Sequence, residues 1–227
     1  MAKHGKKYRE VVKKAPEGLI ELAEAVKFIK ANPVAKFDET AEIAFRLGVD
    51  PKKTEQTVRG TVALPHGTGK KVKILVFAAG AAAEAAKAAG ADFVGNEDLI
   101  EKVKGGWTDF DIAIATPDAM KEVRKLGKVL GPRGLMPNPK TGTVTDDTAT
   151  AVAQSKAGKV EFRMDRHGNV GVPFGKLSFE AEKLVENANS IIAGVKGGKP
   201  AGFKGVYIRT CTVSSTMSVG LRVNVKD

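Results

Sequence analysis

A run of glycine and lysine at residues 66–71 (HGTGKK) is the first place where this sequence could perform chemistry, because glycine-rich loops followed by lysine bind phosphates. A phosphate-binding loop also needs an earlier glycine and a serine or threonine directly after the lysine. The positions concerned hold Leu64 and Lys71. The turn after the apolar run at 73–78 also lacks a dinucleotide-binding glycine pattern. Neither turn therefore predicts a nucleotide site.

The histidines, aspartates and cysteine form no catalytic or metal-binding pattern. The three histidines share no metal-ligand spacing with one another or with Cys211. Asp118 and the pair Asp146 and Asp147 stand where helices should begin, so helix capping explains them. The lone cysteine cannot form an internal disulfide, which is typical of a reducing compartment. We therefore expect no enzyme activity, no cofactor and no metal.

Charge favours a polyanionic partner. Lysine and arginine number 37 against 26 aspartates and glutamates, which gives a net charge of +11, and residues 67–157 carry little of that excess. The alternative is a soluble protein that is basic without a nucleic-acid partner. No stretch approaches the roughly 20 apolar residues that span a bilayer, and the basic residues 1–14 lack the apolar run of an export signal.

Three stretches have the composition of RNA contacts. Residues 36–42 (KFDETAE) combine a cation and an aromatic ring at the start of a strand, and residues 212–218 (TVSSTMS) place hydroxyl side chains around Met217. For the second stretch an ordinary edge strand with a turn is the alternative. The loop 131–140 (GPRGLMPNPK) is either a structural surface loop or a contact through Arg133 and Lys140.

Residues 67–157 alternate between strand and helix patterns. Short apolar runs indicate buried strands at 73–78, 92–94 and 111–115. Helical patterns, capped by Asn96, Asp118 and Asp146 or Asp147, occupy 81–89, 97–104, 119–126 and 147–156. Residues 128–140 are expected to be a loop rich in Gly and Pro. The alternation predicts a small parallel sheet with helices on its faces.

The segments on either side have a different pattern. Apolar residues from Leu19 to Ile29 have helical spacing, and alternation at 41–47 and 219–225 indicates half-buried strands. Alternating residues at 160–164, the turn at 166–169 and the strand at 170–172 predict a hairpin. Ser178 is expected to cap a helix with an apolar face from Leu184 to Val195. These elements suggest an antiparallel sheet with two helices packed on it.

We expect the two outer segments to form one domain, because neither has enough strands for a stable sheet alone. The predicted fold is a discontinuous α+β RNA-binding domain of residues 1–66 plus 158–227, with an inserted α/β, three-layer, Rossmann-like domain of residues 67–157. Gly67, Gly69 and Gly158 would form a hinge between the two domains. A serial arrangement of three small units is the alternative.

Motifs along nearly the whole chain resemble the bacterial family of large-subunit ribosomal protein L1. The matching stretches are AKFDET at 35–40, VRGTVALPHGTGK at 58–70, the DFD and TPD pattern at 109–118, LGPRGLMPNPKTGTV at 130–144, KAGKVEFR at 156–163 and STM at 215–217. The loop in LGPRGLMPNPK is the most specific of them. The chain departs from the family at Ser218 and Val219, where Gly-Pro is usual.

The resemblance implies a ribosomal protein that binds the stalk region of the large-subunit rRNA beside the exit-site tRNA. It also implies help in releasing deacylated tRNA, and binding by the free, monomeric protein to its own operon mRNA to repress translation. The implied location is the cytoplasm, within the ribosome. The RNA-binding residues that it implies are Lys36, Phe37, Thr40, Glu42, Asp165, Arg166, His167, Lys204, Thr210, Ser215, Thr216, Met217 and Ser218.

Two other functions compete with this interpretation. A general RNA chaperone would bind stalk RNA and scrambled RNA equally well. A nucleotide-dependent enzyme would use the α/β domain for its ligand, and the missing phosphate loop and dinucleotide pattern count against it.

Overall fold

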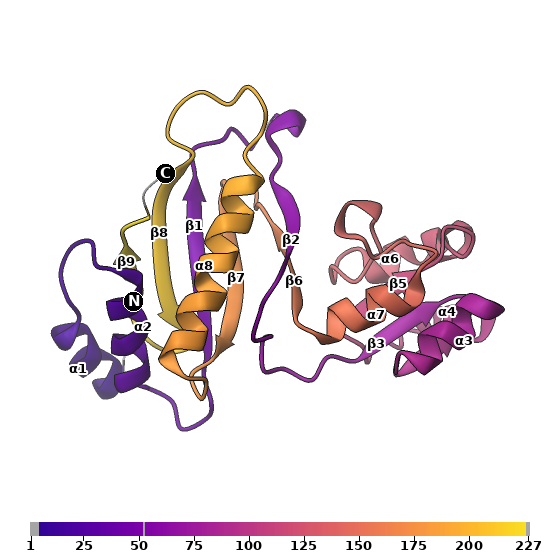
Figure 1. Ribbon diagram of the computed structural model, residues 1–227, viewed down its shortest axis with the longest axis horizontal. Helices are drawn as coiled ribbons and strands as arrows, with labels where there is room; N and C mark the ends of the chain where they lie inside the picture. Colours follow the sequence, from indigo (N-terminus) through magenta and orange to yellow (C-terminus); the bar gives the residue numbers. More distant parts are fainter. Residues whose placement is uncertain (1–4, 52, 226–227) are drawn as a thin grey trace. The chain divides into compact units, whose positions relative to one another are not determined.

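A computed structural model describes residues 5–51 and 53–225, without the side chains of Thr54 and Lys140. Contacts divide the chain into two compact units (Figure 1). The first unit holds residues 1–69 and 160–227, and the second holds residues 70–159. Mixed α and β structure is what the sequence predicted. The expected domain boundaries and the hinge stay predictions.

The first unit is built on a four-stranded antiparallel sheet. Its strands, in the spatial order β7-β1-β8-β9, are β7 (Asn169–Lys176), β1 (Thr40–Leu47), β8 (Ile208–Ser215) and β9 (Leu221–Val223). Side chains alternate along β1: Ala41, Ile43, Phe45 and Leu47 are buried, as predicted. The strand therefore presents one apolar face and one outward face.

Two helices pack on the apolar face of that sheet. Helix α8 (Ala181–Gly197) lies across β7 and beside β2, and α2 (Leu22–Ala31) packs on α8, β8 and β9 (Figure 1). Leu184, Ala188, Ile191 and Val195 of α8 enter the core, which confirms the predicted apolar face. A further helix, α1 (Lys6–Lys14), precedes them, and the sequence analysis did not predict it.

The predicted hairpin at 160–172 is wrong. Strand β6 (Lys159–Arg163) pairs with β2 (Arg59–Ala63) in a separate two-stranded sheet, whereas β7 pairs with β1. The turn between them does form, because the N–H of Asp165 donates to the carbonyl of Asn169 at 2.8 Å. The alternating residues of β6 and β7 correctly predicted two strands, but alternation within a strand does not determine which strand it pairs with.

The second unit contains a three-stranded parallel sheet in the order β4-β3-β5. Its strands are β3 (Ile74–Phe77), β4 (Phe93–Gly95) and β5 (Ile112–Ala115). All four residues of β3 are buried, with Leu75 and Phe77 in one apolar cluster and Ile74 and Val76 in another. Both faces of this sheet are therefore covered, as its continuous apolar runs predicted.

Five α-helices and short 3-10 turns accompany the sheet of the second unit among the described residues. The α-helices are α3 (Ala81–Ala88), α4 (Glu97–Lys104), α5 (Met120–Val123), α6 (Gly127–Leu130) and α7 (Thr148–Lys156). The 3-10 turns are η2 (Arg124–Leu126) and η3 (Pro139–Thr141), and η1 (Thr54–Gln56) lies in the first unit. The predicted loop 128–140 therefore begins only after α6 ends.

The predicted helix caps have mixed outcomes. Asp147 caps α7 by accepting a hydrogen bond from the Thr150 N–H at 3.1 Å, which confirms that prediction. Asn96 stands at the cap position of α4 without a side-chain capping bond, and Asp118 is exposed and caps no helix. Ser178 is also not a cap, because α8 begins three residues later. Leu19 lies before α2 and is exposed.

Candidate functional site

One face of the four-stranded sheet is covered by no helix within residues 5–51 and 53–225, and this face forms the base of the site. Its outward side chains are small or polar. We call this surface the open face. It consists of Glu42, Ala44 and Arg46 of β1, Gly171 and Pro173 of β7, Thr210, Thr212 and Ser214 of β8, and Arg222 of β9. Glu42 lies opposite Pro173 and Ser214 in the strand register. The open face therefore carries small residues between the longer side chains of Glu42, Arg46 and Arg222.

A buried carboxylate organises the end of the sheet where β1 begins. One oxygen of Glu39 accepts hydrogen bonds from the N–H groups of Val34 and Ala35, at 2.9 and 2.7 Å. The other oxygen accepts from the Ser215 hydroxyl at 2.5 Å and from the Met217 N–H at 3.1 Å. Glu39 therefore fixes the loop before β1 against the turn after β8.

Hydrogen bonds outweigh burial in setting the pKa of Glu39. Burial, the largest single contribution, acts to raise the pKa of this carboxyl, while the bonds from Ser215, Ala35, Met217 and Val34 lower it, and the net pKa lies below its ordinary value. Glu39 is therefore ionised at neutral pH, and both of its carboxylate oxygens accept hydrogen bonds from donors within the protein.

Thr40 and Thr216 bind each other beside that carboxylate. The Thr216 hydroxyl accepts from the Thr40 N–H at 3.0 Å, and the Thr216 N–H donates to the Thr40 carbonyl at 3.1 Å. The ammonium of Lys176 donates to the Thr40 hydroxyl at 2.8 Å and to the Asp38 carbonyl at 3.3 Å. Hydroxyls and a cation are thus held in fixed positions at this corner of the sheet.

Two apolar side chains project from the same corner. Phe37 is 58% exposed and Met217 is 51% exposed, although both are large and hydrophobic. Lys36 is exposed beside Phe37. We call Lys36, Phe37, Thr40, Lys176 and the turn 215–218 the Thr40 end of the sheet. The Thr40 end therefore combines exposed apolar side chains with polar groups that hydrogen bonds hold in place.

Ser218 sits in this turn with its hydroxyl oxygen buried and without a hydrogen-bond partner among the described residues. Its N–H donates to the Ser215 carbonyl at 3.1 Å, so the turn itself is closed. The residue has an ordinary negative φ, since no described non-glycine residue has a positive one. Serine in place of the usual glycine is therefore accommodated without backbone strain.

Four of the remaining predicted residues lie at the opposite end of β1: Asp165, Arg166, His167 and Lys204. The Leu47 N–H donates to the Gly168 carbonyl at 2.8 Å, and the Gly48 N–H donates to the Tyr207 carbonyl at 2.8 Å. These bonds place β1 between the turn 165–168 and the loop 203–207. We call this region the Gly48 end.

Asp165 shapes the turn at the Gly48 end. Its carboxylate accepts from the N–H groups of His167 and Asn169 at 2.7 and 2.8 Å. The Asn169 N–H bond is the largest contribution that lowers the pKa of Asp165 below its ordinary value. Because its acceptor positions face the turn, Asp165 acts as a support for Arg166 and His167, which are exposed. Lys204 and Thr210 are exposed on the neighbouring loop and strand.

The predicted residues thus form two groups and not one. Seven residue steps separate Thr40 from Leu47, which at about 3.3 Å per residue puts the two ends roughly 23 Å apart. Glu42 and Thr210 lie on the open face between the ends. An elongated ligand could contact both groups at once, whereas a small molecule could not.

Sequence reasoning missed Glu39, Lys176 and Arg209. A signal for Glu39 was present: it shares the odd register of the buried residues Ala41 and Ile43, while Thr40 and Glu42 share the even, outward register. Lys176 pairs with Thr40 only through the β1–β7 register, which local patterns do not give.

The predicted hinge glycines all have left-handed backbone conformations. Gly67, Gly69 and Gly158 have φ values of 64°, 73° and 102°. Buried Asn187 of α8 binds the chain before the first of them, donating to the Gly67 carbonyl at 2.9 Å and accepting from the His66 N–H at 3.1 Å. The path of the chain through residue 67 is therefore fixed to α8.

The loop 131–140 is held together by its own hydrogen bonds. The Asn138 N–H donates to the Thr143 hydroxyl at 2.7 Å, and the buried Thr141 hydroxyl donates to the Asn138 carbonyl at 3.0 Å. Arg133 is exposed and bonds to the Thr108 hydroxyl. The side chain of Lys140 lies outside the described residues. These bonds stabilise the conformation of the loop, and a contact through Arg133 stays a proposal.

Two other kinds of site are absent from the described residues. No group of three or more His, Cys, Asp or Glu side chains within 5–51 and 53–225 could hold a metal ion. No helix in the same ranges is long and apolar enough to cross a membrane.

The structure is that of a mixed α and β protein in which one sheet carries an extended surface with exposed hydroxyl and basic side chains. The model of the ribosomal protein L1p/L10e family matches residues 27–219, and the chain belongs to that family. The match confirms the resemblance seen in the sequence motifs. Membership makes the chain a ribosomal protein that binds rRNA of the large subunit, in a family of structural proteins and not of enzymes.

Proposed function

We propose that the chain binds the stalk region of the large-subunit rRNA through the open face and both ends of its four-stranded sheet. The observation that carries the proposal is the Thr40 end, where exposed Phe37 and Met217 flank hydroxyls and an ammonium held by hydrogen bonds. RNA recognition uses the same combination: apolar groups pack on bases and riboses, hydroxyls bind 2′-hydroxyls, and cations bind phosphates.

Each residue at the Thr40 end has a separate role in this proposal. Lys36 and Lys176 contact phosphates, and Phe37 and Met217 pack on a base or ribose. Glu42 accepts hydrogen bonds from 2′-hydroxyls or base amino groups, because its carboxylate is exposed on the open face. The hydroxyls of Thr40 and Ser214 border Glu42. Since internal bonds already fix much of this surface, little ordering is left for RNA to impose.

The Gly48 end would supply a second contact. Arg166, His167 and Lys204 are exposed there and Thr210 continues the surface along β8. An RNA stem about 20 Å wide would reach both ends of the sheet, whose separation is of similar size. Contacts at two distant points set the orientation of a stem better than contacts at one point.

We also propose that the second unit, residues 70–159, is an inserted domain that moves on the hinge at Gly67, Gly69 and Gly158, in which the bonds from Asn187 make residues 66 and 67 the fixed side. Support comes from the two compact units and from the positive φ values of these glycines. Within the ribosome such motion would help deacylated tRNA leave the exit site. The free, monomeric protein would use the same RNA surface to bind its own operon mRNA and repress translation.

Gel-shift binding to the stalk rRNA fragment, with a scrambled RNA of equal length as control, tests the proposed function. Binding should favour the stalk RNA and persist across a salt series, because much of its free energy comes from non-ionic contacts. Equal, steeply salt-dependent binding to both RNAs would instead identify a general RNA chaperone. Thermal stabilisation by a nucleotide would support the enzyme alternative.

Operon repression needs a separate measurement. Unlabelled mRNA leader should displace labelled stalk RNA from the protein, since the proposal gives both RNAs one surface. Simultaneous binding of both RNAs would contradict it.

Deleting residues 70–159 and joining Gly69 to Val160 with a short glycine linker tests which of the two units binds RNA. The remaining unit contains the Thr40 end, the open face and the Gly48 end, so stalk binding should be kept. Far-ultraviolet circular dichroism would verify that the fragment is folded. A folded fragment without affinity would show that residues 70–159 carry the site.

A further inference from the structure

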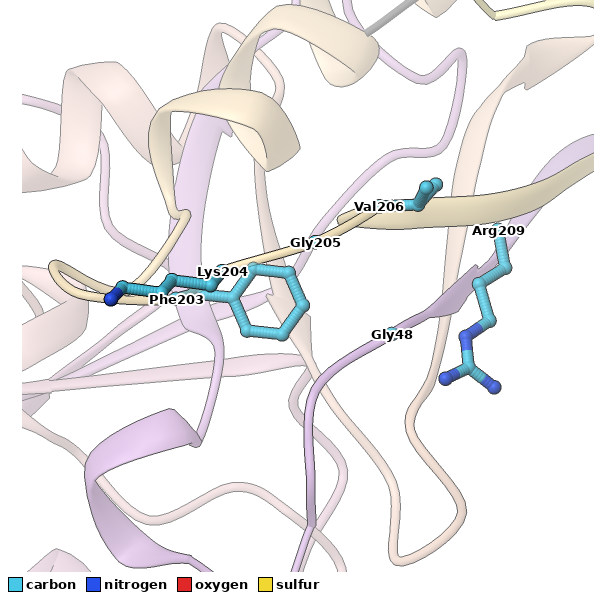
Figure 2. Close-up of a pocket in the computed structure, with 6 residues that line it drawn as sticks. All are labelled: Gly48, Phe203, Lys204, Gly205, Val206 and Arg209. Carbon is cyan, nitrogen blue, oxygen red and sulfur yellow. The ribbon is translucent and has the colours of Figure 1, made fainter.

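The Gly48 end contains a pocket from which the proposed contacts use Lys204 alone. It is a cavity of about 440 Å³ lined by Gly48, Phe203, Lys204, Gly205, Val206 and Arg209 (Figure 2). This volume lies within the range of about 300–1,000 Å³ that small ligand groups occupy in proteins. A loop after α8 and the first residues of β8 form one side of the pocket, and the end of β1 forms its floor.

Gly48 makes the close approach of these segments possible. A Cβ atom on Gly48 would lie 2.2 Å from the Val206 carbonyl oxygen and 3.4 Å from both Phe203 Cζ and Arg209 Nε. The aromatic ring and the guanidinium therefore reach the same glycine from two directions, as Figure 2 shows. Gly205, with a φ of 113°, lets the loop turn above the pocket.

The ring of Phe203 is held in a defined orientation. It packs edge-on against Tyr207, with ring centroids 6.0 Å apart and planes at 63°. Tyr207 is buried, and its hydroxyl donates to the Val195 carbonyl at 3.1 Å. Phe203 itself is only partly buried. The pocket thus offers an aromatic surface whose orientation depends on a buried neighbour.

Positive charge surrounds this ring. Lys199 places its ammonium 5.9 Å from the ring centroid, and the exposed side chains of Lys204 and Arg209 extend on either side of the ring (Figure 2). Neither Lys204 nor Arg209 forms an ion pair within the part of the chain that the structure describes. The sequence contains no acidic residue between Glu186 and Asp227. The pocket is therefore aromatic and cationic without a neutralising carboxylate from its own loop.

We propose that this pocket takes one unstacked nucleobase of a single-stranded RNA segment. The base stacks on Phe203 and displaces water from Val206, which is 63% exposed despite being apolar. Lys204 and Arg209 bind the phosphates on either side of that nucleotide. Aromatic stacking combined with cations that follow the backbone is the general means of holding single-stranded nucleic acid. This inference rests on the proposed RNA-binding function and adds a site for an unpaired nucleotide to it.

The position of the pocket agrees with its proposed occupant. β1 runs directly from the open face into Gly48, and the turn 165–168 borders the same strand end. A stem lying on the open face would bring its loop or a bulged nucleotide to the Gly48 end. The pocket would then bind an unpaired nucleotide that the residues of the open face do not contact.

The inference is tested on the full-length protein by combining removal of the base from the RNA probe with substitution of Phe203. The probes are a single-stranded oligonucleotide of about six residues that carries one central adenine among abasic residues, and the same oligonucleotide with every residue abasic. With the wild-type protein, base removal should weaken binding roughly tenfold. The Phe203→Leu variant should bind both probes as weakly as the wild-type protein binds the probe without the base, because the aromatic ring on which the base stacks has been removed. Independent, additive losses from base removal and Phe203→Leu would overturn the proposal.

Three further variants keep the test decisive if Phe203→Leu alters the loop. Arg209→Gln, on an exposed side chain, should weaken both probes and reduce the salt dependence of binding. Lys27→Gln, on the exposed side of α2, is the matched control for loss of one charge. Phe203→Trp should preserve binding, and in a Trp107→Phe background its fluorescence should be quenched by the probe that carries the adenine. Unchanged binding by Arg209→Gln together with unquenched Phe203→Trp fluorescence would also overturn the proposal.

The stalk fragment separates this inference from the proposed function. If wild-type protein prefers stalk RNA over scrambled RNA while Phe203→Leu and Arg209→Gln bind it unchanged, the pocket proposal fails and the function stands. If wild-type protein shows no preference, the proposed function fails, whatever the pocket variants do.

Discussion

The carboxylate of Glu39 accepts a hydrogen bond of 2.5 Å from the hydroxyl of Ser215, a residue 176 positions later in the chain. The same carboxylate receives three backbone N–H groups, so it joins the loop before β1 to the turn after β8. Charge-assisted bonds of this length are among the stronger hydrogen bonds in proteins. The geometry of the Thr40 end therefore depends on a residue that RNA itself would not touch.

The pH dependence of stability provides the first prediction. The folded-state pKa of Glu39 lies below its ordinary value of 4.5. Its contribution to the free energy of unfolding is therefore fully present above pH 4.5 and is lost as the pH falls through the lower folded-state pKa. Glu39→Gln should cost on the order of 2 kcal/mol at neutral pH, because an amide cannot accept all four donors.

Urea unfolding at a series of pH values checks this prediction. The difference in unfolding free energy between wild type and Glu39→Gln should shrink as the pH falls below 4.5. Glu101→Gln, an exposed substitution on α4, is the control and should change stability by only a few tenths of a kcal/mol. A wild-type advantage that stays constant into acid would contradict the role of the ionised carboxylate.

Thr216 provides a prediction about RNA affinity. Its hydroxyl accepts from the Thr40 N–H at 3.0 Å and can donate to the Thr40 carbonyl at 3.3 Å, so it has one acceptor position left for RNA. Thr216→Val removes both hydrogen bonds between the hydroxyl and Thr40, and it removes the free acceptor position. Stalk binding should weaken by about 1–3 kcal/mol in a titration of folded protein.

Thr216→Ser is the matched control for that measurement. Serine keeps the hydroxyl and loses only a methyl group, so stalk affinity should stay close to that of the wild type. Thermal unfolding would show whether each variant is intact. Undiminished binding by intact Thr216→Val would remove Thr216 from the interface.

Local patterns predicted those parts of the fold that local patterns control. Alternation from Ala41 to Leu47 predicted β1 because one of its faces is buried, and the continuous apolar run at 74–77 predicted β3 because both of its faces are buried. A cap at Asp146 or Asp147 was predictable because a capping side chain acts within one turn of the chain, and Asp147 is the residue that caps α7.

Long-range pairing was not predictable in the same way. β6 and β7 alternate as hairpin strands do, and the turn at Asp165 closes, yet the two strands join different sheets. Strand partners depend on the packing of α8 and α2 on the completed sheet, which no local window contains. The same limit applies to the site, since Thr40, Lys176 and Thr216 meet only when β7, β1 and β8 are aligned.

The single cysteine provides a prediction about chemical reactivity. Cys211 lies in β8 opposite Phe45 and is buried, which raises the pKa of its thiol to about 12. Almost no thiolate exists at pH 8, and the thiolate is the reactive form. Ellman's reagent should therefore react far more slowly with the folded protein than with the protein in concentrated urea. Comparable rates in the two conditions would show that β8 opens readily.

The contact between α8 and β2 provides the last prediction. A Cβ atom on Gly194 would lie 2.2 Å from Val62 Cγ2, whereas one on Gly197, in the same helix, would meet no atom within 4 Å. Both substitutions to alanine raise helix propensity, by up to about 1 kcal/mol. Gly197→Ala should therefore stabilise the protein, while Gly194→Ala should destabilise it by about 1–3 kcal/mol through overpacking.

Urea unfolding of both variants, and of Gly194→Ala combined with Val62→Ala, distinguishes overpacking from a general effect of glycine replacement. Shortening Val62 removes the atom that the new methyl group would strike, so the double variant should be more stable than the sum of the single effects predicts. Purely additive effects, or equal shifts for Gly194→Ala and Gly197→Ala, would mean that α8 does not need glycine at residue 194 to approach β2. The closeness of that approach matters for the site, because α8 also holds Gly67 through Asn187.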